Sequence, residues 1–330
     1  MISKRINYFL CLLLIASVAL FTTGCKSKKS KSSKNTSSNK TLKLSDNIRN
    51  IPLDSLIPKT TAITGKGEKE ISEKIHNDYM YGTLAGQYGK LDVCEKYMVK
   101  VLKKEPTFVE AHHNLGLCYY KQGRIDEAVK EWKRTLELNP NYAEAYYNLA
   151  IFLMDMKRDD ESLELLNRCV KYDPFHLKAR FALGTIYKNK GLNKQAIMHF
   201  KAYESKDKGD VRVLTALGEL YLLEGQDDAS LKAFESVSRI DPKNGKVFYQ
   251  LGVAYHKKGL LDNAIVNYQR ASELMPNNAD SYINLGDVYA IKGEFQSALA
   301  SYNAALAIDP SNSYAIRKVK NVEAKLLKNE

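Results

Sequence analysis

Apolar residues recur at three- and four-residue steps over most of the chain, in pairs of short segments separated by a turn. Such spacing is typical of amphipathic helices that bury one face. Gly123, between the two segments, indicates the end of the first helix, and Pro140, after the second segment, indicates the end of the second helix. The pattern therefore predicts a helical hairpin. Two apolar series define it in residues 109–142: Leu115, Cys118 and Tyr119, and then Ala128, Val129, Trp132 and Leu136.

The hairpin pattern repeats with a period of 34 residues. One hairpin alone cannot hide its apolar faces, so we expect the copies to stack into a continuous all-α core. Copies start at 109, 143, 177, 211, 245 and 279. Six of the eight prolines mark the period, namely Pro106, Pro140, Pro174, Pro242, Pro276 and Pro310.

The repeated unit resembles the tetratricopeptide repeat (TPR), whose pattern is W-x2-L-G-x2-Y, then A-x3-F, then P. The resemblance implies an all-α fold, a right-handed TPR superhelix (α-solenoid) of about seven helix-turn-helix repeats plus a C-terminal capping helix. It also implies a concave groove that holds a protein or peptide partner. In the 109 copy the pattern is met by His112, Leu115, Gly116, Tyr119, Ala128, Trp132 and Pro140.

The repeats divide the chain into parts. Residues 69–108 contain a degenerate copy that we expect to cap the N-terminal end, residues 109–312 hold six TPR repeats, and residues 313–330 form a capping helix with a polar outer face. Two departures stand out in the series. Lys157 replaces the glycine between the helices of the 143 copy, and residues 207–210 replace proline in the 177 copy, where we expect altered curvature or a flexible joint near 203–210.

Residues 1–25 are typical of an export signal. Lys4 and Arg5 precede an apolar run at 8–21, which is short for a membrane span and ends in Gly24-Cys25. This ending resembles the bacterial lipobox, although Thr22 is not the usual aliphatic residue. By that resemblance Cys25 becomes the lipidated first residue of the mature protein. The alternatives are an uncleaved anchor or an ordinary signal peptide.

Residues 26–68 are predicted to be a disordered Lys/Ser-rich tether and linker, because their composition cannot bury enough apolar surface to fold. Nine of the twelve net positive charges lie in residues 1–43. The nearly neutral remainder argues against nucleic-acid binding, whereas lysines beside a lipid suit anionic headgroups. Within the linker, residues 51–58 form a short apolar strip framed by prolines. It is either extended, docked on the repeats, or a recognition strip for a partner.

The sequence contains no catalytic or cofactor motif, so the protein is predicted not to be an enzyme and to need no cofactor or metal. The adjacent His112 and His113 point about 100° apart on a helix and cannot chelate one metal together. Three cysteines of the repeats occupy places for small core residues. A disulfide between Cys94 and Cys118 is possible, but spacing alone does not establish it.

Each first helix turns places 2, 5, 9 and 12 of its copy to one side, with place 6 beside them, and the TPR resemblance implies that this side is the groove. Carboxamides at place 6 can bond both N–H and C=O of an extended peptide, and aromatic side chains add contact area. The alternative is that asparagine at place 6 only ties neighbouring helices together. The candidate peptide-binding residues are Asn114, Asn148, Asn284, Gln250, His113, Tyr120, Tyr147, Phe181, Tyr249 and Lys178.

These features favour a non-catalytic, lipid-anchored scaffold of the bacterial cell envelope, whose groove recruits a protein into an envelope complex. Lys26 after the lipidated cysteine favours the outer membrane, facing the periplasm, if the organism has one. Two alternatives remain open. The architecture is similar to the pilotin lipoproteins that assist a type IV pilus secretin, and an accessory of cell-wall or polysaccharide enzymes is also consistent with it.

Overall fold

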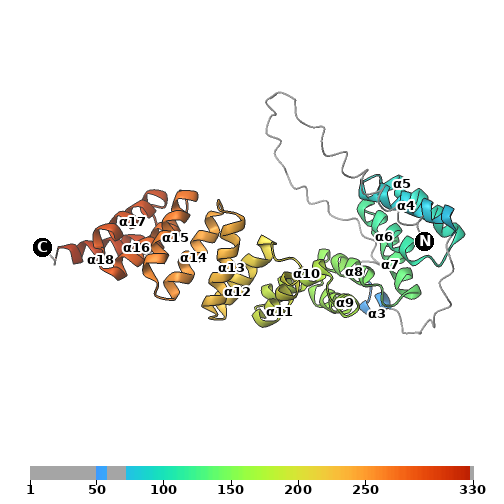
Figure 1. The fold of residues 1–330 in the computed structure, drawn as a ribbon, viewed down its shortest axis with the longest axis horizontal. Coiled ribbons are helices and arrows are strands. Elements are labelled where there is room, and N and C mark those ends of the chain that lie inside the picture. The colour runs from blue at the N-terminus through green and yellow to red at the C-terminus, as the bar shows by residue number, and fades with distance from the viewer. Residues whose placement is uncertain (1–49, 58–71, 328–330) are drawn as a thin grey trace, which may run out of the picture. The chain divides into compact units, whose positions relative to one another are not determined.

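A computed structural model describes residues 50–57 and 72–327. The described ranges hold 16 helices and no strands, which confirms the all-α solenoid predicted from the sequence (Figure 1). Each helix from α4 onward packs against the next one along the chain. The first helices of successive hairpins are α4 (Glu73–Gln87), α6 (Val109–Gln122), α8 (Ala143–Asp155), α10 (Leu177–Asn189), α12 (Val211–Leu223), α14 (Gly245–Lys257) and α16 (Ala279–Lys292). Their partners are α5 (Leu91–Lys104), α7 (Ile125–Leu138), α9 (Asp159–Tyr172), α11 (Asn193–Glu204), α13 (Asp227–Ile240), α15 (Leu261–Leu274) and α17 (Phe295–Ile308), and α18 (Ser313–Leu326) follows.

Close contact within most hairpins depends on a glycine in the first helix. A Cβ atom added to Gly116 would lie 2.6 Å from Nε1 of Trp132, and one added to Gly252 would lie 2.5 Å from the ring of Tyr268. Real Cβ atoms do not approach so closely, so a larger residue would push the helices apart or distort the aromatic ring. The glycine therefore makes room for a fully buried aromatic side chain in the second helix.

The turn inside each hairpin uses a left-handed residue. Gly123 has φ 82° and donates its amide hydrogen to the carbonyl of Tyr120, which satisfies one carbonyl at the helix end. In the 143 copy, Lys157 adopts the same left-handed conformation with φ 58°. The side chain disfavours that conformation, but the amide of Lys157 still bonds the carbonyl of Met154. The departure at Lys157 therefore changes the residue and keeps the turn.

The 177 copy differs from the others at its end. Its second helix, α11, spans 12 residues, whereas the second helices of the other hairpins span 14. Tyr203 is buried at this point, and its hydroxyl donates a 2.8 Å hydrogen bond to Asp210. Asp210 in turn caps α12 by accepting from the amide of Arg212. This contact bridges the loop between α11 and α12, and the flexible joint at 203–210 stays a prediction.

The two ends of the series expose different surfaces. At the N-terminal end, Met80, Tyr81 and Leu84 of α4 are exposed, as is Tyr88 directly after it. At the C-terminal end, α18 buries Ala315 and Val322 and turns charged residues to the outside. The last helix thus has the polar surface typical of a solenoid cap.

Part of the linker is ordered, which corrects the expectation of an extended chain for these residues. Residues 51–57 include the short helix α3 (Leu53–Leu56), and Leu56 is buried in the same core as the first hairpins. The carbonyl of Ile51 accepts a 2.8 Å hydrogen bond from Arg158, at the start of α9. The linker strip is therefore docked on the repeats, which is one of the three possibilities that the sequence left open.

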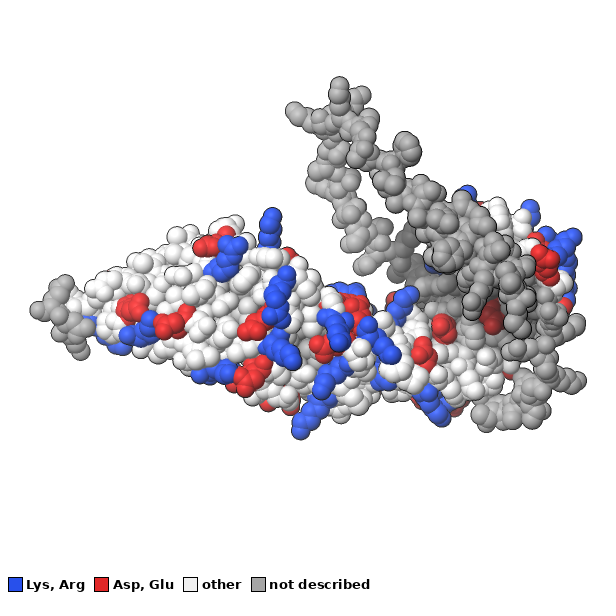
Figure 2. All heavy atoms as spheres, viewed as in Figure 1, with Lys and Arg blue, Asp and Glu red and all other residues white. Residues whose placement is uncertain are grey.

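Residues 1–49, which include the apolar run, Cys25 and the tether, lie outside the described residues. Among the helices that are described, none combines the length and the apolar character that a membrane span requires. On the face of the repeats drawn in Figure 2, basic and acidic side chains are interspersed.

Candidate functional site

The predicted groove residues of the N-terminal hairpins bond to one another across repeats. Asn114 donates through Nδ2 to the hydroxyl oxygens of Tyr79 (3.0 Å) and Thr83 (3.1 Å) in α4. His113 Nδ1 lies 3.3 Å from Oδ1 of Asn114, and Nδ2 of Asn148 lies 2.9 Å from Nε2 of His113. The chain of bonds runs through α4, α6 and α8. It ties neighbouring helices together, which is the alternative role that the sequence left open for place-6 asparagine.

The protonation of His113 follows from these bonds. Because Nε2 accepts a hydrogen from Asn148, Nδ1 carries the proton and donates to Asn114. Burial lowers the pKa of His113. His112 points elsewhere and lies 2.6 Å from the carboxylate of Glu131, which raises its pKa although burial acts in the opposite direction. The two histidines do not share a site, and both are occupied by structural contacts.

Three further candidates also have partners. The Tyr120 hydroxyl donates to Asp155 at the end of α8, and the ring of Tyr147 lies 4.8 Å from that of His176. Phe181 packs on Phe200, and the Arg212 guanidinium lies 4.9 Å from the Phe181 ring centroid. These side chains are held between repeats.

Lys178 is exposed at the start of α10 and forms no ion pair within the described part of the chain. Asn284 donates a 2.9 Å hydrogen bond to the hydroxyl of Tyr249, 35 positions earlier. The same 35-residue separation joins Tyr79 to Asn114 and His113 to Asn148. In these three pairs, the place-6 asparagine therefore donates a hydrogen bond to the place-5 residue of the preceding copy.

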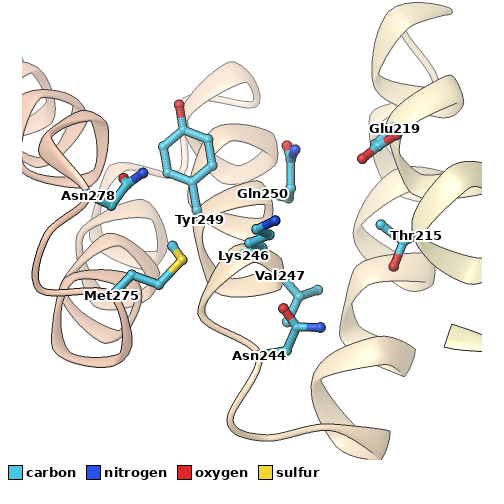
Figure 3. A pocket seen from close by; sticks show the side chains of 9 residues that line it. All are labelled: Thr215, Glu219, Asn244, Lys246, Val247, Tyr249, Gln250, Met275 and Asn278. Carbon is cyan, nitrogen blue, oxygen red and sulfur yellow. The ribbon is translucent and has the colours of Figure 1, made fainter. Parts of the chain in front are cut away.

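A pocket of about 290 Å³ lies between α12 and α14, and we call it the α12–α14 pocket. In Figure 3, Gln250 and Lys246 project from α14 into the space facing Thr215 and Glu219 on α12, while Met275 and Asn278 border the pocket on the other side of α14. The pocket thus collects two predicted site residues, Tyr249 and Gln250. Its lining is Thr215, Glu219, Asn244, Lys246, Val247, Tyr249, Gln250, Met275 and Asn278.

Several polar groups of the α12–α14 pocket are uncommitted within the described residues. Gln250 forms no hydrogen bond there. Asn244 precedes α14 but makes no side-chain cap, whereas Asn278 caps α16 through its oxygen and leaves its N–H donors available. Glu219 is neutralised by Lys188, and Lys246 has no acidic partner. The pocket therefore offers amide donors, amide acceptors and one positive charge beside an aromatic ring.

Sequence reasoning missed most of this lining. Thr215, Glu219 and Lys246 occupy groove places 5, 9 and 2 of their copies, so the groove places alone were enough to predict them. Asn244 and Asn278 lie at the last place of the unit, which the helical period of the first helix does not cover. They could have been found from their position as the residue before the next helix.

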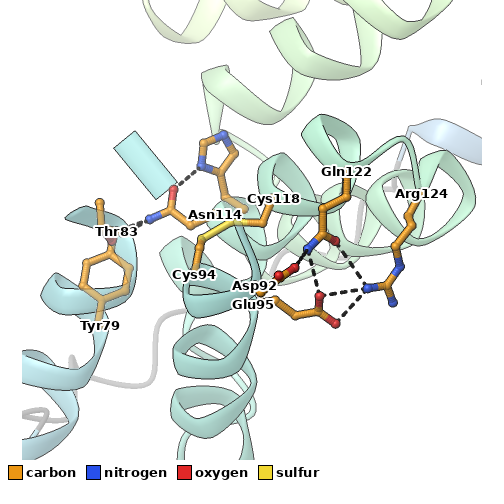
Figure 4. The surroundings of a disulfide bond; sticks show 10 residues. Tyr79, Thr83, Asp92, Cys94, Glu95, Asn114, Cys118, Gln122 and Arg124 are labelled. Carbon is orange, nitrogen blue, oxygen red and sulfur yellow. Dashed lines mark hydrogen bonds and ion pairs between the residues drawn. A yellow bond between two sulfur atoms is a disulfide. The ribbon is translucent and has the colours of Figure 1, made fainter. Parts of the chain in front are cut away.

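A second, smaller pocket of about 110 Å³ lies beside a disulfide that joins Cys94 in α5 to Cys118 in α6. Figure 4 shows the bond between the Asn114 contacts on one side and a polar cluster on the other. In that cluster, Arg124 bonds Glu95 at 2.8 Å. The expectation that Cys94 and Cys118 are merely small core residues is thus incomplete, because both are buried and also bonded to each other. Cys169 is buried and free.

Within residues 50–57 and 72–327, no three or more His, Cys, Asp and Glu side chains lie close enough to hold a metal ion. The polar groups of the α12–α14 pocket are hydrogen-bonding and charged groups that suit recognition of another molecule.

Stacked helical hairpins with a groove lined by their first helices define a class of α-solenoid repeat proteins. Family models for the tetratricopeptide repeat match residues 97–130, 143–176 and 245–311, and a TPR repeat model matches 116–156 and 218–259. Together they cover 97–176 and 218–311, which is more than half of the chain. The chain belongs to the tetratricopeptide repeat family. No curated protein matches it.

Solved structures share the fold. The structure of YrrB, described as a TPR protein with an unusual peptide-binding site, matches with a TM-score of 0.53 at 22% identity and covers 57% of this chain and 97% of YrrB. The C-terminal part of a TPR repeat-containing protein from Cytophaga hutchinsonii matches with a TM-score of 0.54 at 19% identity, covering 73% of this chain and 99% of that one. At these identities the likeness concerns the fold.

Proposed function

We propose that this TPR protein is a non-catalytic scaffold that holds an extended segment of a protein partner at the α12–α14 pocket. In this proposal lipidated Cys25 and the Lys-rich residues 26–43 anchor the scaffold to a membrane of the bacterial cell envelope, where it recruits the partner into an envelope complex. The outer membrane, facing the periplasm, is the favoured location in an organism that has one.

The peptide-binding part of the proposal rests on the carboxamide groups of the α12–α14 pocket that have no hydrogen-bond partner within the described residues. An extended peptide presents unpaired N–H and C=O groups, and a carboxamide can satisfy one of each. Gln250 and Asn244 have both groups free within the described residues, and Asn278 has its N–H donors free. By contrast, Asn114 donates two hydrogen bonds between repeats, and Asn148 and Asn284 donate one each.

Two further features of the pocket suit a peptide. Tyr249 and Met275 supply apolar contact area, and the unpaired charge of Lys246 can attract an acidic side chain. Lys246 is exposed, so salt will weaken its contribution. YrrB supports the proposal as a peptide-binding protein of the same fold.

Site-specific cross-linking in cells tests peptide binding at the α12–α14 pocket. A photoreactive residue at position 215, on the α12 side of the pocket, should capture a discrete protein, and the same chain with Lys246→Ala/Gln250→Ala should recover about tenfold less of it, since each lost contact costs about 0.5–1.5 kcal/mol. Asn267→Ala is the matched control, because Asn267 bonds a carbonyl of its own helix, α15, outside the pocket. Equal recovery by the double variant and this control would rule out binding at the pocket.

Fractionation tests the anchor. The full chain should accumulate in membranes and carry a lipid, whereas Cys25→Ser should be found in the soluble fraction or retain its N-terminal segment. A Cys25→Ser chain with the same lipid content and the same membrane fraction as the original would contradict lipidation at this residue.

A further inference from the structure

The docked linker residues 51–57, which we call the strap, meet the repeats at one edge. Leu56 is buried, and Ile51, Leu53 and Ile57 pack against the core of the N-terminal hairpins. Arg158, the residue before α9, donates a 2.8 Å hydrogen bond from Nη2 to the carbonyl of Ile51, 107 positions earlier. Figure 1 shows α3 beside α9, in agreement with this bond. The strap therefore attaches to the third hairpin.

The neighbouring edge shows what the strap replaces. Arg124 holds the equivalent place one repeat earlier and pairs with Glu127 three residues on, as Arg158 pairs with Glu161. The remaining donors of Arg124 bond Glu95, in the preceding hairpin (Figure 4). One period later, Val129 stands where Glu95 would be, so Arg158 has no carboxylate there. The backbone carbonyl of Ile51 takes that role instead.

The same comparison, one period later in the sequence, shows that the edge of the third hairpin is more apolar than the neighbouring edge. Gln122, which bonds Glu95 at the neighbouring edge, is replaced one period later by Met156. Val129 is buried and Met156 partly buried in the core cluster that contains Leu56. Compared with the neighbouring edge, two polar residues are thus replaced by apolar ones at the edge where the apolar strap docks. The pattern indicates an edge adapted to the strap.

We propose that the edge formed by Val129, Met156 and Arg158 is a docking site for the chain's own residues 51–57, and that this contact sets where the membrane leash joins the repeats. The role as a leash rests on the proposed function. With the strap docked, 25 residues (26–50) separate Cys25 from the body, and with it released, 46 residues (26–71) do. At about 3.5 Å per residue, the greatest reach from the membrane is about 90 Å instead of about 160 Å.

Hydrogen exchange on the full chain, without lipid or partner, tests the docking. Residues 51–57 should exchange at least tenfold faster in Arg158→Gln and in Leu56→Asp than in the original chain. Arg124→Gln is the matched control, because it removes the equivalent guanidinium at the edge without the strap, and it should leave residues 51–57 protected. Equal loss of protection in Arg124→Gln and Arg158→Gln, or no protection in the original chain, would overturn the proposal.

A synthetic peptide of residues 49–59 adds a second measurement. It should bind the Leu56→Asp chain, whose site is vacated, and should bind neither the original chain nor the Leu56→Asp/Arg158→Gln chain. Peptide binding that ignores Arg158 would overturn the assigned site. A concentration-dependent dimer that dissociates on Leu56→Asp would show that the strap docks on a second copy, which contradicts docking within one chain.

The leash is tested separately, on chain purified from membranes and returned to vesicles that contain a dansyl lipid. Trp132 is the only tryptophan, so its energy transfer to the lipid reports the distance of the N-terminal hairpins from the bilayer. Release of the strap by Leu56→Asp should lower the transfer at least twofold. Unchanged transfer would overturn the leash role, whereas a chain that does not bind vesicles at all would contradict lipidation and leave the exchange result standing.

Discussion

The N-terminal hairpins (residues 72–189) and the C-terminal hairpins (residues 211–327) are built from one repeat but are tied together differently. In the first part the described buried residues form one continuous core cluster, which also includes Leu56, and a disulfide and a chain of groove hydrogen bonds cross the repeats. In the second part they fall into five separate clusters, one of which also includes residues of α11. The larger pocket, with its free amides, lies in this second part.

On the function that we propose, this difference separates cohesion from recognition between copies of the repeat. Groove amides that bond to each other tie neighbouring repeats together and are not available to a peptide. Groove amides that stay free are available for a ligand. Because the stability of a solenoid is roughly a sum over repeats and their interfaces, substitutions should act mainly within their own part.

The largest effect should come from emptying the hairpin core in each part. Trp132→Ala and Phe234→Ala remove equivalent, fully buried rings, and each should cost about 3–5 kcal/mol. In hydrogen exchange, Trp132→Ala should weaken protection across residues 72–189, whereas Phe234→Ala should weaken it only near residues 211–257. Loss of protection throughout the chain in both variants would show that the two parts unfold as one unit.

The next effect concerns the disulfide of the N-terminal part. Replacing Cys94 and Cys118 by serine should lower stability by about 3 kcal/mol, because the bond closes a loop of 24 residues in the unfolded chain. Urea unfolding with and without a reductant measures the loss, and the double variant should not respond to the reductant. The exchange rates of residues 211–327 serve as the internal control and should not change.

A smaller effect should appear on acidification at His199, between the two parts. Burial, and then the charge of Arg180, lower the pKa of His199 from 6.5 to about 4. The unfolded chain takes up a proton near pH 6.5 and the folded chain does so only near 4, so the stabilising contribution is complete above pH 6.5 and is lost as the pH falls. At pH 5 the loss should be about 2 kcal/mol.

His199→Gln separates this effect from other titrations. Glutamine retains an acceptor for Arg180, whose Nη1 lies 3.2 Å from Nδ1 of His199, and it does not titrate. The drop in urea midpoint between pH 7.5 and pH 5 should therefore be smaller in His199→Gln than in the original chain. An identical drop in both chains would mean that His199 does not carry the pH dependence.

Much of the fold could be predicted because the period constrains it. The 34-residue spacing of proline and glycine requires a hairpin in each copy, and the all-α solenoid that it predicts is the fold observed. The position of Lys157 at a glycine place even indicates its left-handed backbone. Local pattern was sufficient here, since every copy gives the same information again.

The site was less predictable, because it depends on contacts between copies. The helical period placed Gln250 and Tyr249 on the face that lines the α12–α14 pocket, but it could not show that Asn114 donates hydrogen bonds to Tyr79 and Thr83. The 35-residue separation of such pairs is visible in the sequence only once the bond is known. Docking of the strap is still harder to predict, since nothing near Ile51 in the sequence indicates that its carbonyl accepts a hydrogen bond from Arg158.

The close fit of glycine against an aromatic ring inside each hairpin makes the two positions epistatic. Six hairpins place glycine at this contact, and five of them oppose it with Trp132, Phe200, Phe234, Tyr268 or Tyr302. The 143 copy has Ala150 instead, and opposite it stands Leu166, an aliphatic side chain in place of a ring. The extra methyl group on one helix is thus offset by a smaller residue on the other. A larger residue at the glycine position alone would clash with the ring, so the residue tolerated at one position depends on the residue at the other.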